Sequence, residues 1–394
     1  MTYTFSDNFK ELAPSAIREI LKSASAPDII AFSAGNPNAA SFPLREMRQI
    51  CGDIFEQSGA KALQYGATEG YTPLRLAVTE RQRARFGVGR DFDDTLITSG
   101  GQQALELACR VLCNPGDTML SEDPSFIGAL NAFRGAGVRL AGVPLERDGM
   151  NLEALEKAMT ENPRVRLLYT IPTFHNPTGI TTSFAKRQGI YELAKKHGVL
   201  ILEDNPYGEL RFSGEDIPPI KALDEDGIVI YCSSFSKLLS AGMRVGFAIA
   251  PRPIVAKMTV CKQTEDVHSN LFFQILCHRF MTEHDFDGHI ASIKALYGGK
   301  AALMTDAFDT YMPPSVSRTR PQGGLFLWCS LPESIDLPTF CAEALRRKVA
   351  VVPGTAFSVE QDSCRHDFRV TYATPTDEQL VQGMRILSEV IADM

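Results

Sequence analysis

The sequence predicts an α/β protein: a large domain with a mostly parallel sheet covered by helices on both faces, and a smaller α+β domain. Two observations lead to this prediction. In the middle of the chain, short apolar runs alternate with amphipathic helical patterns, and several runs are apolar on both faces, as in strands buried on both sides. After about residue 285 the pattern changes to a long helix, short apolar runs and a closing helix.

Each element is predicted from its local pattern. Apolar runs bounded by turn residues predict strands, amphipathic stretches predict helices, and Gly198 is a typical helix stop. In the large domain the strands are expected within 94–100, 118–123, 138–145, 165–172, 199–207, 227–234 and 247–250, and the helices within 101–113, 126–137, 151–159 and 184–198. In the smaller domain we expect a helix over about 288–310, strands within 323–331, 349–354 and 368–373, and a helix within 376–394.

These patterns divide the chain into two domains. We assign residues 46–285 to the large domain, and residues 1–45 together with 286–394 to the smaller one, because the first 45 residues are too irregular to join the main sheet. A cleft between two domains is the usual place for a ligand. We therefore expect the functional site where the domains meet.

Composition excludes several classes of protein. The 394 residues carry a net charge of −7, which gives no electrostatic case for binding nucleic acid. The first residues lack a signal-peptide pattern, and no apolar run is long enough for a membrane helix, so we expect no membrane association. Nine scattered cysteines suit a reducing cytoplasm. Cys109 and Cys113 are interpreted as half-buried helix residues, and no metal is expected.

The segment CSSFSKLLSAGMRVG, residues 232–246, suggests a chemical site. It places serines around Lys237 and adds Arg244 one short loop later. A lysine amine becomes a good nucleophile when burial or nearby cations lower its pKa, and its best-known use is a Schiff base with a carbonyl. Pyridoxal phosphate (PLP) supplies such a carbonyl, and Ser234, Ser236 and Arg244 suit its phosphate. A serine-rich surface loop with an incidental lysine is the alternative.

A carboxylate follows another apolar strand in VLILEDNPYGEL. Asp204 and Tyr207 stand where the strand ends, the position at which parallel sheets present groups to a ligand. A carboxylate beside the pyridine nitrogen of PLP raises the pKa of that nitrogen and keeps it protonated. Tyr207 suits a hydrogen bond to the phenolic oxygen of the cofactor. An ordinary Asp-Asn-Pro turn is the structural alternative.

Two further turns carry suitable groups. In TIPTFHNPTGI, the amide of Asn176 suits the phenolic oxygen of the cofactor or a substrate carboxylate, although N-P-x-G is also a plain turn sequence. In TSGGQQAL, Gly101 and Gln102 begin a predicted helix. Their backbone N–H groups would face the phosphate, because a helix N-terminus is an anion site. Each signal is weak by itself.

Together these motifs resemble the fold-type I PLP-dependent aminotransferases. The resemblance covers nearly the whole chain and rests on NPTG, EDNPY, SFSK with Arg244, and FRVTYA in this order. The branch that acts on 2-aminoadipate and kynurenine is the most similar, through SAIREIL, FSAGNP, LQYGATEGYTPLR, GGQQAL, EDPSFIGA and RPQGGLFLW. The resemblance implies the PLP-dependent transferase fold, with Lys237, Asp204 and Tyr207 as catalytic residues.

The resemblance also implies roles that the residues alone do not. Arg369 matches the arginine that binds the substrate α-carboxylate, although alone it reads as a strand-end surface residue. Gly35 matches a backbone contact to the same carboxylate, together with Asn176. Tyr65 matches a tyrosine that reaches the cofactor of the neighbouring subunit, which implies a homodimer with shared active sites. Phe126 matches the aromatic residue that stacks on the cofactor ring, where many relatives have tyrosine.

The segment APSAIREIL, residues 13–21, matches a mobile lid in this branch. It begins a short amphipathic helix that carries Ser15 and Arg18, two expected substrate-binding residues. The arginine that matches Arg18 can meet the distal carboxylate of an acidic substrate. An arginine that swings out would let one pocket accept acidic and apolar side chains, because a fixed, buried and unpaired charge would reject the apolar ones. A solvated position on an exposed helix face is the alternative.

The expected activity is therefore amino-group transfer by ping-pong chemistry through a Lys237 aldimine. The donor would be an L-amino acid (2-aminoadipate, aromatic or aliphatic) and the acceptor a 2-oxo acid, expected to be 2-oxoglutarate. A PLP-dependent carbon–sulfur lyase on the same fold would keep every cofactor residue. A non-catalytic ligand-sensing domain of a transcription regulator and an unrelated cytosolic α/β binding protein are further alternatives. The acidic charge and the lack of room for a DNA-binding domain weigh against the sensor.

Overall fold

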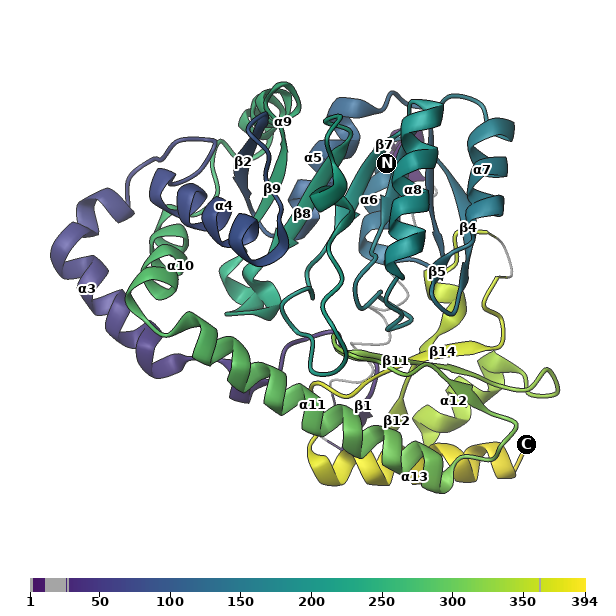
Figure 1. The fold of residues 1–394 in the computed structure, drawn as a ribbon. Helices are drawn as coiled ribbons and strands as arrows, with labels where there is room; N and C mark the ends of the chain where they lie inside the picture. Colours follow the sequence, from purple (N-terminus) through teal and green to yellow (C-terminus); the bar gives the residue numbers. More distant parts are fainter. Residues whose placement is uncertain (1–2, 11–25, 27, 361–362) are drawn as a thin grey trace.

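A computed structural model describes residues 3–10, 26, 28–360 and 363–394. Within this part of the chain the main feature is an 8-stranded sheet with the order β2-β9-β8-β7-β6-β3-β4-β5 (Figure 1). Its strands are β2 (Asp93–Thr98), β3 (Thr118–Asp123), β4 (Arg139–Glu146), β5 (Gly149–Met150), β6 (Val165–Thr170), β7 (Leu200–Asp204), β8 (Val229–Ser234) and β9 (Gly246–Pro251).

The centre of this sheet is parallel, which confirms the predicted fold class. Strands β8, β7, β6, β3 and β4 run in the same direction, whereas β2, β9 and the short β5 pair antiparallel with their neighbours. The carboxyl ends of β6, β7 and β8 therefore meet at one edge of the sheet. Because β9 runs back from that edge, the loop between β8 and β9 is held there by strands at both ends.

Helices cover both faces of the sheet, as predicted. Neighbouring strand residues point to opposite faces, so Leu167, Leu202 and Ile230 pack in one hydrophobic cluster and Leu168, Ile201 and Val229 in another. The first cluster includes α5 (Gly101–Leu112), α6 (Ile127–Gly135) and α9 (Arg252–Glu265), and the second α7 (Leu152–Glu161) and α8 (Phe184–His197). Within the described residues, the other α-helices before residue 285 are α1 (Asp7–Lys10), α3 (Leu44–Ala62), α4 (Thr72–Phe86) and α10 (Leu271–Glu283).

The last part of the chain forms a smaller α+β unit. Its antiparallel sheet has the order β10-β11-β14-β13, and β1 pairs with β12 in a separate parallel pair. The strands are β1 (Ile30–Ala31), β10 (Ser317–Arg318), β11 (Phe326–Ser330), β12 (Val349–Ala350), β13 (Val352–Pro353) and β14 (Asp367–Thr371), and the helices are α11 (Phe286–Tyr311), α12 (Leu337–Arg346) and α13 (Asp377–Ala392). The largest hydrophobic cluster extends from Phe247 in the main sheet to Leu387 in α13, so the exact domain boundaries stay a prediction.

The described part of the chain contains no helix that is both long and apolar enough to cross a bilayer. It also contains no cluster of His, Cys, Asp or Glu side chains suited to holding a metal ion. Of the two helix cysteines, Cys109 is buried inside α5 and Cys113 is half-buried at its C-terminal cap.

Candidate active site

One cavity, with a volume of about 430 Å³, lies at the carboxyl edge of the parallel strands. A volume of this size is typical of a site for a small organic ligand. The cavity is lined by Gly35, Gly101, Gln102, Phe126, Asn176, Asp204, Tyr207, Ser234, Ser236, Lys237, Arg244 and Arg369, all of which the sequence singled out. Tyr65 does not line it, and Ser15 and Arg18 lie outside the described residues.

Lys237 enters the cavity from the loop that follows β8. It ends a short 3-10 helix, η3 (Phe235–Lys237), and its Nζ donates a hydrogen bond to the Gly35 carbonyl at 2.7 Å. Burial lowers the pKa of Lys237 to about 8, and the positive charges of Arg369 and Arg244 act in the same direction. Roughly a tenth of this amine is therefore uncharged, and hence nucleophilic, at pH 7, far more than in an ordinary lysine.

An anion cradle lies beside this lysine. The hydroxyls of Ser234 and Ser236 are hydrogen-bonded at 2.7 Å, and the Arg244 guanidinium approaches Ser236 Oγ at 3.4 Å. The N-terminus of α5 faces the same space through Gly101 and has no side-chain cap. Glycine is favoured at position 100 by its φ of +83°, and a Cβ there would also lie 2.2 Å from Arg244 Nη2 and displace that guanidinium. Hydroxyl, guanidinium and helix N–H donors together suit a phosphate group.

A carboxyl group lies at the end of β7. The side chain of Asp204 is buried, and its Oδ2 accepts a hydrogen bond from the Tyr169 hydroxyl at 2.9 Å. Burial raises the pKa of Asp204 to about 7, the Tyr169 hydrogen bond opposes this shift, and the charge of Glu203 adds to it. No ion pair of Asp204 is found within the described residues. A cationic ring nitrogen placed against it would stabilise the ionised carboxylate.

Arg369 is buried in the middle of β14, not at the surface as its local pattern suggests. Its guanidinium lies 4.2 Å from the ring centre of Phe326 and 4.9 Å from that of Phe357. It donates to Asn176 Oδ1 and to the Ser33 carbonyl, both at 2.9 Å, and Nε has no partner among the described residues. Burial lowers its pKa to about 10. A buried guanidinium with no carboxylate partner in the described chain suits a carboxylate ligand.

Asn176 and Tyr207 complete this wall of the cavity. Burial raises the pKa of the Tyr207 hydroxyl well above its ordinary value, and Arg369 and a hydrogen bond from Asn176 act against that shift. The loop that carries Asn176 is supported by Arg187, which donates to the carbonyls of Pro172 and Thr182 within the loop and to that of Pro218 in a separate segment. The position of Asn176 thus depends on a side chain in α8.

Phe126 and Gln102 also line the cavity. Phe126 is the N-cap residue of α6, and Gln102 Nε2 donates to the Gly128 carbonyl at 2.7 Å. Tyr65 points away from this cavity: it is 80% exposed in the single chain, and its ring centre lies 5.6 Å from that of His268. An exposed aromatic residue of this kind is available for contact with a second subunit.

The site contains supporting residues that sequence reasoning missed. Tyr169 supports Asp204, and Arg187 supports the Asn176 loop. Glu122 at the end of β3 accepts from Thr170 Oγ1 and the Ile171 backbone, and burial raises its pKa to about 8. Polar residues inside the apolar runs 118–123 and 165–172 were the available signal, since buried polar groups require partners.

The geometry fits the predicted cofactor. The Gly100 turn and the serine hydroxyls offer a phosphate cradle, Lys237 offers an amine, and Asp204 offers a carboxyl group without an ion-pair partner. Arg369 remains available to a carboxylate through its unpartnered Nε. The cavity therefore has suitable groups for PLP and for an amino-acid substrate.

Comparisons with known proteins agree with this geometry. The family model described as aminotransferase class I and II matches residues 27–387. Aromatic-amino-acid aminotransferase 1 of Thermococcus litoralis is 38% identical over 99% of this chain and 94% of its own length. 2-Aminoadipate transaminase of Thermus thermophilus is 37% identical over 96% and 94%. The crystal structure of Pyrococcus horikoshii kynurenine aminotransferase, in complex with PMP, matches with a TM-score of 0.95 and 37% identity over 99% of this chain and 97% of that one.

The raised pKa values of Asp204 and Glu122 predict how the cofactor-free protein responds to pH. Folding raises the pKa of Asp204 from about 4 to about 7 and that of Glu122 from about 4 to about 8. The folded state therefore favours the protonated carboxyl groups. The stability that their protonation provides is complete below pH 4 and is lost as the pH rises through 7 and 8. Asp204→Asn should therefore reduce the loss of unfolding free energy between pH 5 and 8 by roughly 1–3 kcal/mol. Urea unfolding of the cofactor-free protein measures this, with the exposed Asp91→Asn as control. An unchanged pH dependence in Asp204→Asn would contradict the prediction.

Proposed function

We propose that this chain, which belongs to the class I and II aminotransferases and is a PLP-dependent transaminase, accepts both acidic and apolar amino donors. The donors would include 2-aminoadipate and aromatic or aliphatic amino acids, with 2-oxoglutarate as the acceptor. The names of the relatives above support this range, since they refer to aromatic amino acids, 2-aminoadipate and kynurenine. The observation that carries an amino acid as the substrate is the buried guanidinium of Arg369, which lines the same cavity as Lys237.

The cofactor, pyridoxal phosphate, supplies a carbonyl that reacts with amines and a ring that withdraws electrons from the substrate Cα. We propose that Ser234, Ser236, Arg244 and the N-terminus of α5 bind its phosphate. Asp204 would hold a proton at the ring nitrogen, and Tyr207 would donate to the phenolic oxygen. These roles are supported by the donors that line the cavity and by the buried carboxyl at the end of β7.

The substrate would be bound by its α-carboxylate. Arg369 and Asn176 would orient that group with the backbone of Gly35, which also holds Lys237 Nζ at 2.7 Å. Lys237 would accept the Cα proton of the substrate and later return a proton, because a lysine with a pKa of about 8 can serve as a base near neutral pH. Phe126 would pack against the cofactor ring.

The working unit is proposed to be a homodimer with shared sites. Tyr65 would reach the cofactor of the partner subunit, as the resemblance implies. Large apolar side chains exposed in the single chain support an interface: Leu63, two positions before Tyr65, is 72% exposed, and Leu76 of α4 is 65% exposed. Donor choice would depend on Arg18 and Ser15, which lie outside the described residues, through contact of Arg18 with a distal carboxylate.

The first prediction from the proposed function concerns the amine of Lys237. Lys237→Ala should lower transaminase turnover by at least about 10²–10⁴-fold, because the proton-transfer group is lost. The cofactor should still bind through Ser234, Ser236 and Arg244, as visible absorbance after dialysis would show. The exposed Lys257→Ala serves as control. Wild-type turnover in Lys237→Ala would refute the proposed role.

The second prediction concerns shared sites. Tyr65→Ala and Lys237→Ala homodimers should both be impaired, yet mixed subunits should regain activity, because one site of the hybrid then holds an intact lysine and the partner's intact tyrosine. The measurement is turnover after the two variants are unfolded together and refolded, with sedimentation to verify dimers. If Tyr65 acts only within its own subunit, mixing the two variants will not restore turnover.

The third prediction concerns donor choice. Arg18→Ala should lower kcat/KM for dicarboxylic substrates by roughly 10–100-fold, the scale of one lost charge-assisted hydrogen bond. Aromatic donors should change much less in their own half-reaction. Single-turnover measurement of both half-reactions separates the two classes, and the exposed Arg385→Ala is the control. Equal losses for both classes would show that Arg18 does not select substrates.

A further inference from the structure

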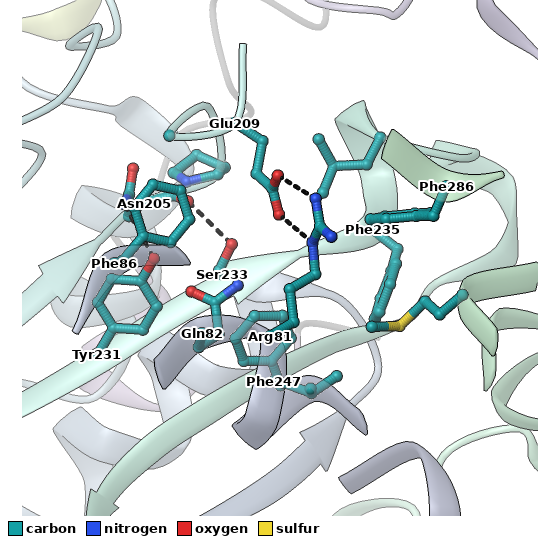
Figure 2. Close-up of a pocket in the computed structure, with 15 residues that line it drawn as sticks. Arg81, Gln82, Phe86, Asn205, Glu209, Tyr231, Ser233, Phe235, Phe247 and Phe286 are labelled. Carbon is teal, nitrogen blue, oxygen red and sulfur yellow. Dashed lines mark hydrogen bonds and ion pairs between the residues drawn. The ribbon is translucent and has the colours of Figure 1, made fainter. Parts of the chain in front are cut away.

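A second, much smaller cavity lies between α4 and the segment 205–209 that follows β7 (Figure 2). Most of its wall is aromatic or aliphatic, with Phe86 and Phe247 among the side chains drawn. Several polar groups nevertheless reach it, and Figure 2 shows the ends of Gln82, Tyr231 and Ser233 directed toward the same space. Polar ends inside an apolar wall require hydrogen-bond partners.

Two side-chain amides that line this cavity, those of Gln82 and Asn205, have acceptor oxygens without a donor in the described chain. Gln82 is 5% exposed and Asn205 is 3% exposed. Gln82 Oε1 and Asn205 Oδ1 both lack a partner among the residues that the structure describes. The other end of the Asn205 amide is used, because Nδ2 donates to the Tyr231 hydroxyl at 2.9 Å. Leaving a buried acceptor without a donor is costly, so an occupant with two donors is expected.

The size of the cavity selects the occupant. It offers about 20 Å³ to the centre of a water-sized sphere, slightly more than the roughly 10–15 Å³ that one buried water requires. A buried water commonly makes about three hydrogen bonds. Two would be donated to Gln82 and Asn205, and the third accepted from Tyr231, whose hydroxyl proton has no acceptor within the described chain.

We propose that this cavity holds one buried water molecule that links Gln82 of α4 to Asn205, and that Gln82 thereby positions the neighbouring Asp204 and Tyr207. The inference rests on the proposed roles of those two residues. A monovalent cation suits the cavity less well, because the carboxylate that lines it, Glu209, is already paired with Arg81 through two hydrogen bonds.

The surrounding contacts explain how such a water would act on the active site. Asn205 directly follows Asp204, and its carbonyl accepts from Ser233 Oγ at 2.9 Å. At the other end of the segment, Glu209 forms a two-bond ion pair with Arg81, at 2.8 and 2.7 Å. Helix α4 thus holds the segment directly through Arg81 and, in the proposal, through Gln82 and the water (Figure 2). Loss of either contact would loosen the segment that follows Asp204, whose carboxylate is otherwise held by the Tyr169 hydroxyl.

Two matched variants test the proposal. Gln82→Leu keeps the approximate size and removes the acceptor, whereas Gln82→Glu keeps an acceptor. We expect electron density for one water within hydrogen-bond distance of residue 82 and Asn205 in crystals of the wild type and Gln82→Glu, and none in Gln82→Leu. Gln82→Leu should also lower kcat by about 10- to 100-fold with little change in KM, as a misplaced catalytic group would. The pH at which the bound cofactor changes colour should also shift in Gln82→Leu. In Gln82→Glu, kcat and this pH should match those of the wild type.

Other outcomes would overturn the inference. An empty wild-type cavity, or activity that requires potassium and fails in choline buffer, would exclude a water in that place. Water density together with an unchanged pH titration and kcat in Gln82→Leu would exclude the positioning role. The crystallographic result does not depend on turnover, so it stands or fails separately from Lys237→Ala, which tests the proposed function.

Discussion

The arrangement of the site depends on one buried guanidinium without a counter-charge in the described chain. Arg369 is held between two aromatic rings and donates to an amide oxygen and a carbonyl, which stabilise a buried charge less than a carboxylate does. Arg369 belongs to the small sheet, whereas Asn176 follows β6 of the large one. The contact between them joins the two sheets at the cavity. The charge that remains unpaired there favours a carboxylate ligand, and it also lowers the pKa of Lys237.

Charges within the cavity are separated by sign. Lys237, Arg244 and Arg369 make the region around the amine positive, whereas Asp204 lies at the end of β7 with Tyr169 beside it. This separation follows from the topology: adjacent parallel strands bring their carboxyl ends to one edge, and each strand contributes a different loop there. A ligand that carries a phosphate at one end and a cationic ring nitrogen at the other matches that distribution of charge.

Much of this site could be predicted from the sequence because its residues immediately follow apolar strands. Lys237, Asp204 and Asn176 share that local signal, and their joint order identified the family. The supporting residues could not be found in this way. Tyr169 reaches Asp204 across 35 positions, and Gln82 lies more than a hundred positions from Asn205, so only the folded chain shows that they are neighbours. Arg369 resembled a surface residue because the rings of Phe326 and Phe357 that enclose it come from elsewhere in the sequence.

The buried side chain of Arg187 has a consequence for the evolution of this protein. It holds the Asn176 loop by donating to the backbone carbonyls of Pro172 and Thr182 and to the Thr173 hydroxyl, and it also donates to the carbonyls of Ile217 and Pro218 in a separate segment. Every residue type carries a carbonyl oxygen, so substitutions in much of the loop leave this support intact. The support itself therefore requires an arginine in α8 but no particular side chain at Pro172 or Thr182, whereas Asn176 is constrained by its own contact with Arg369.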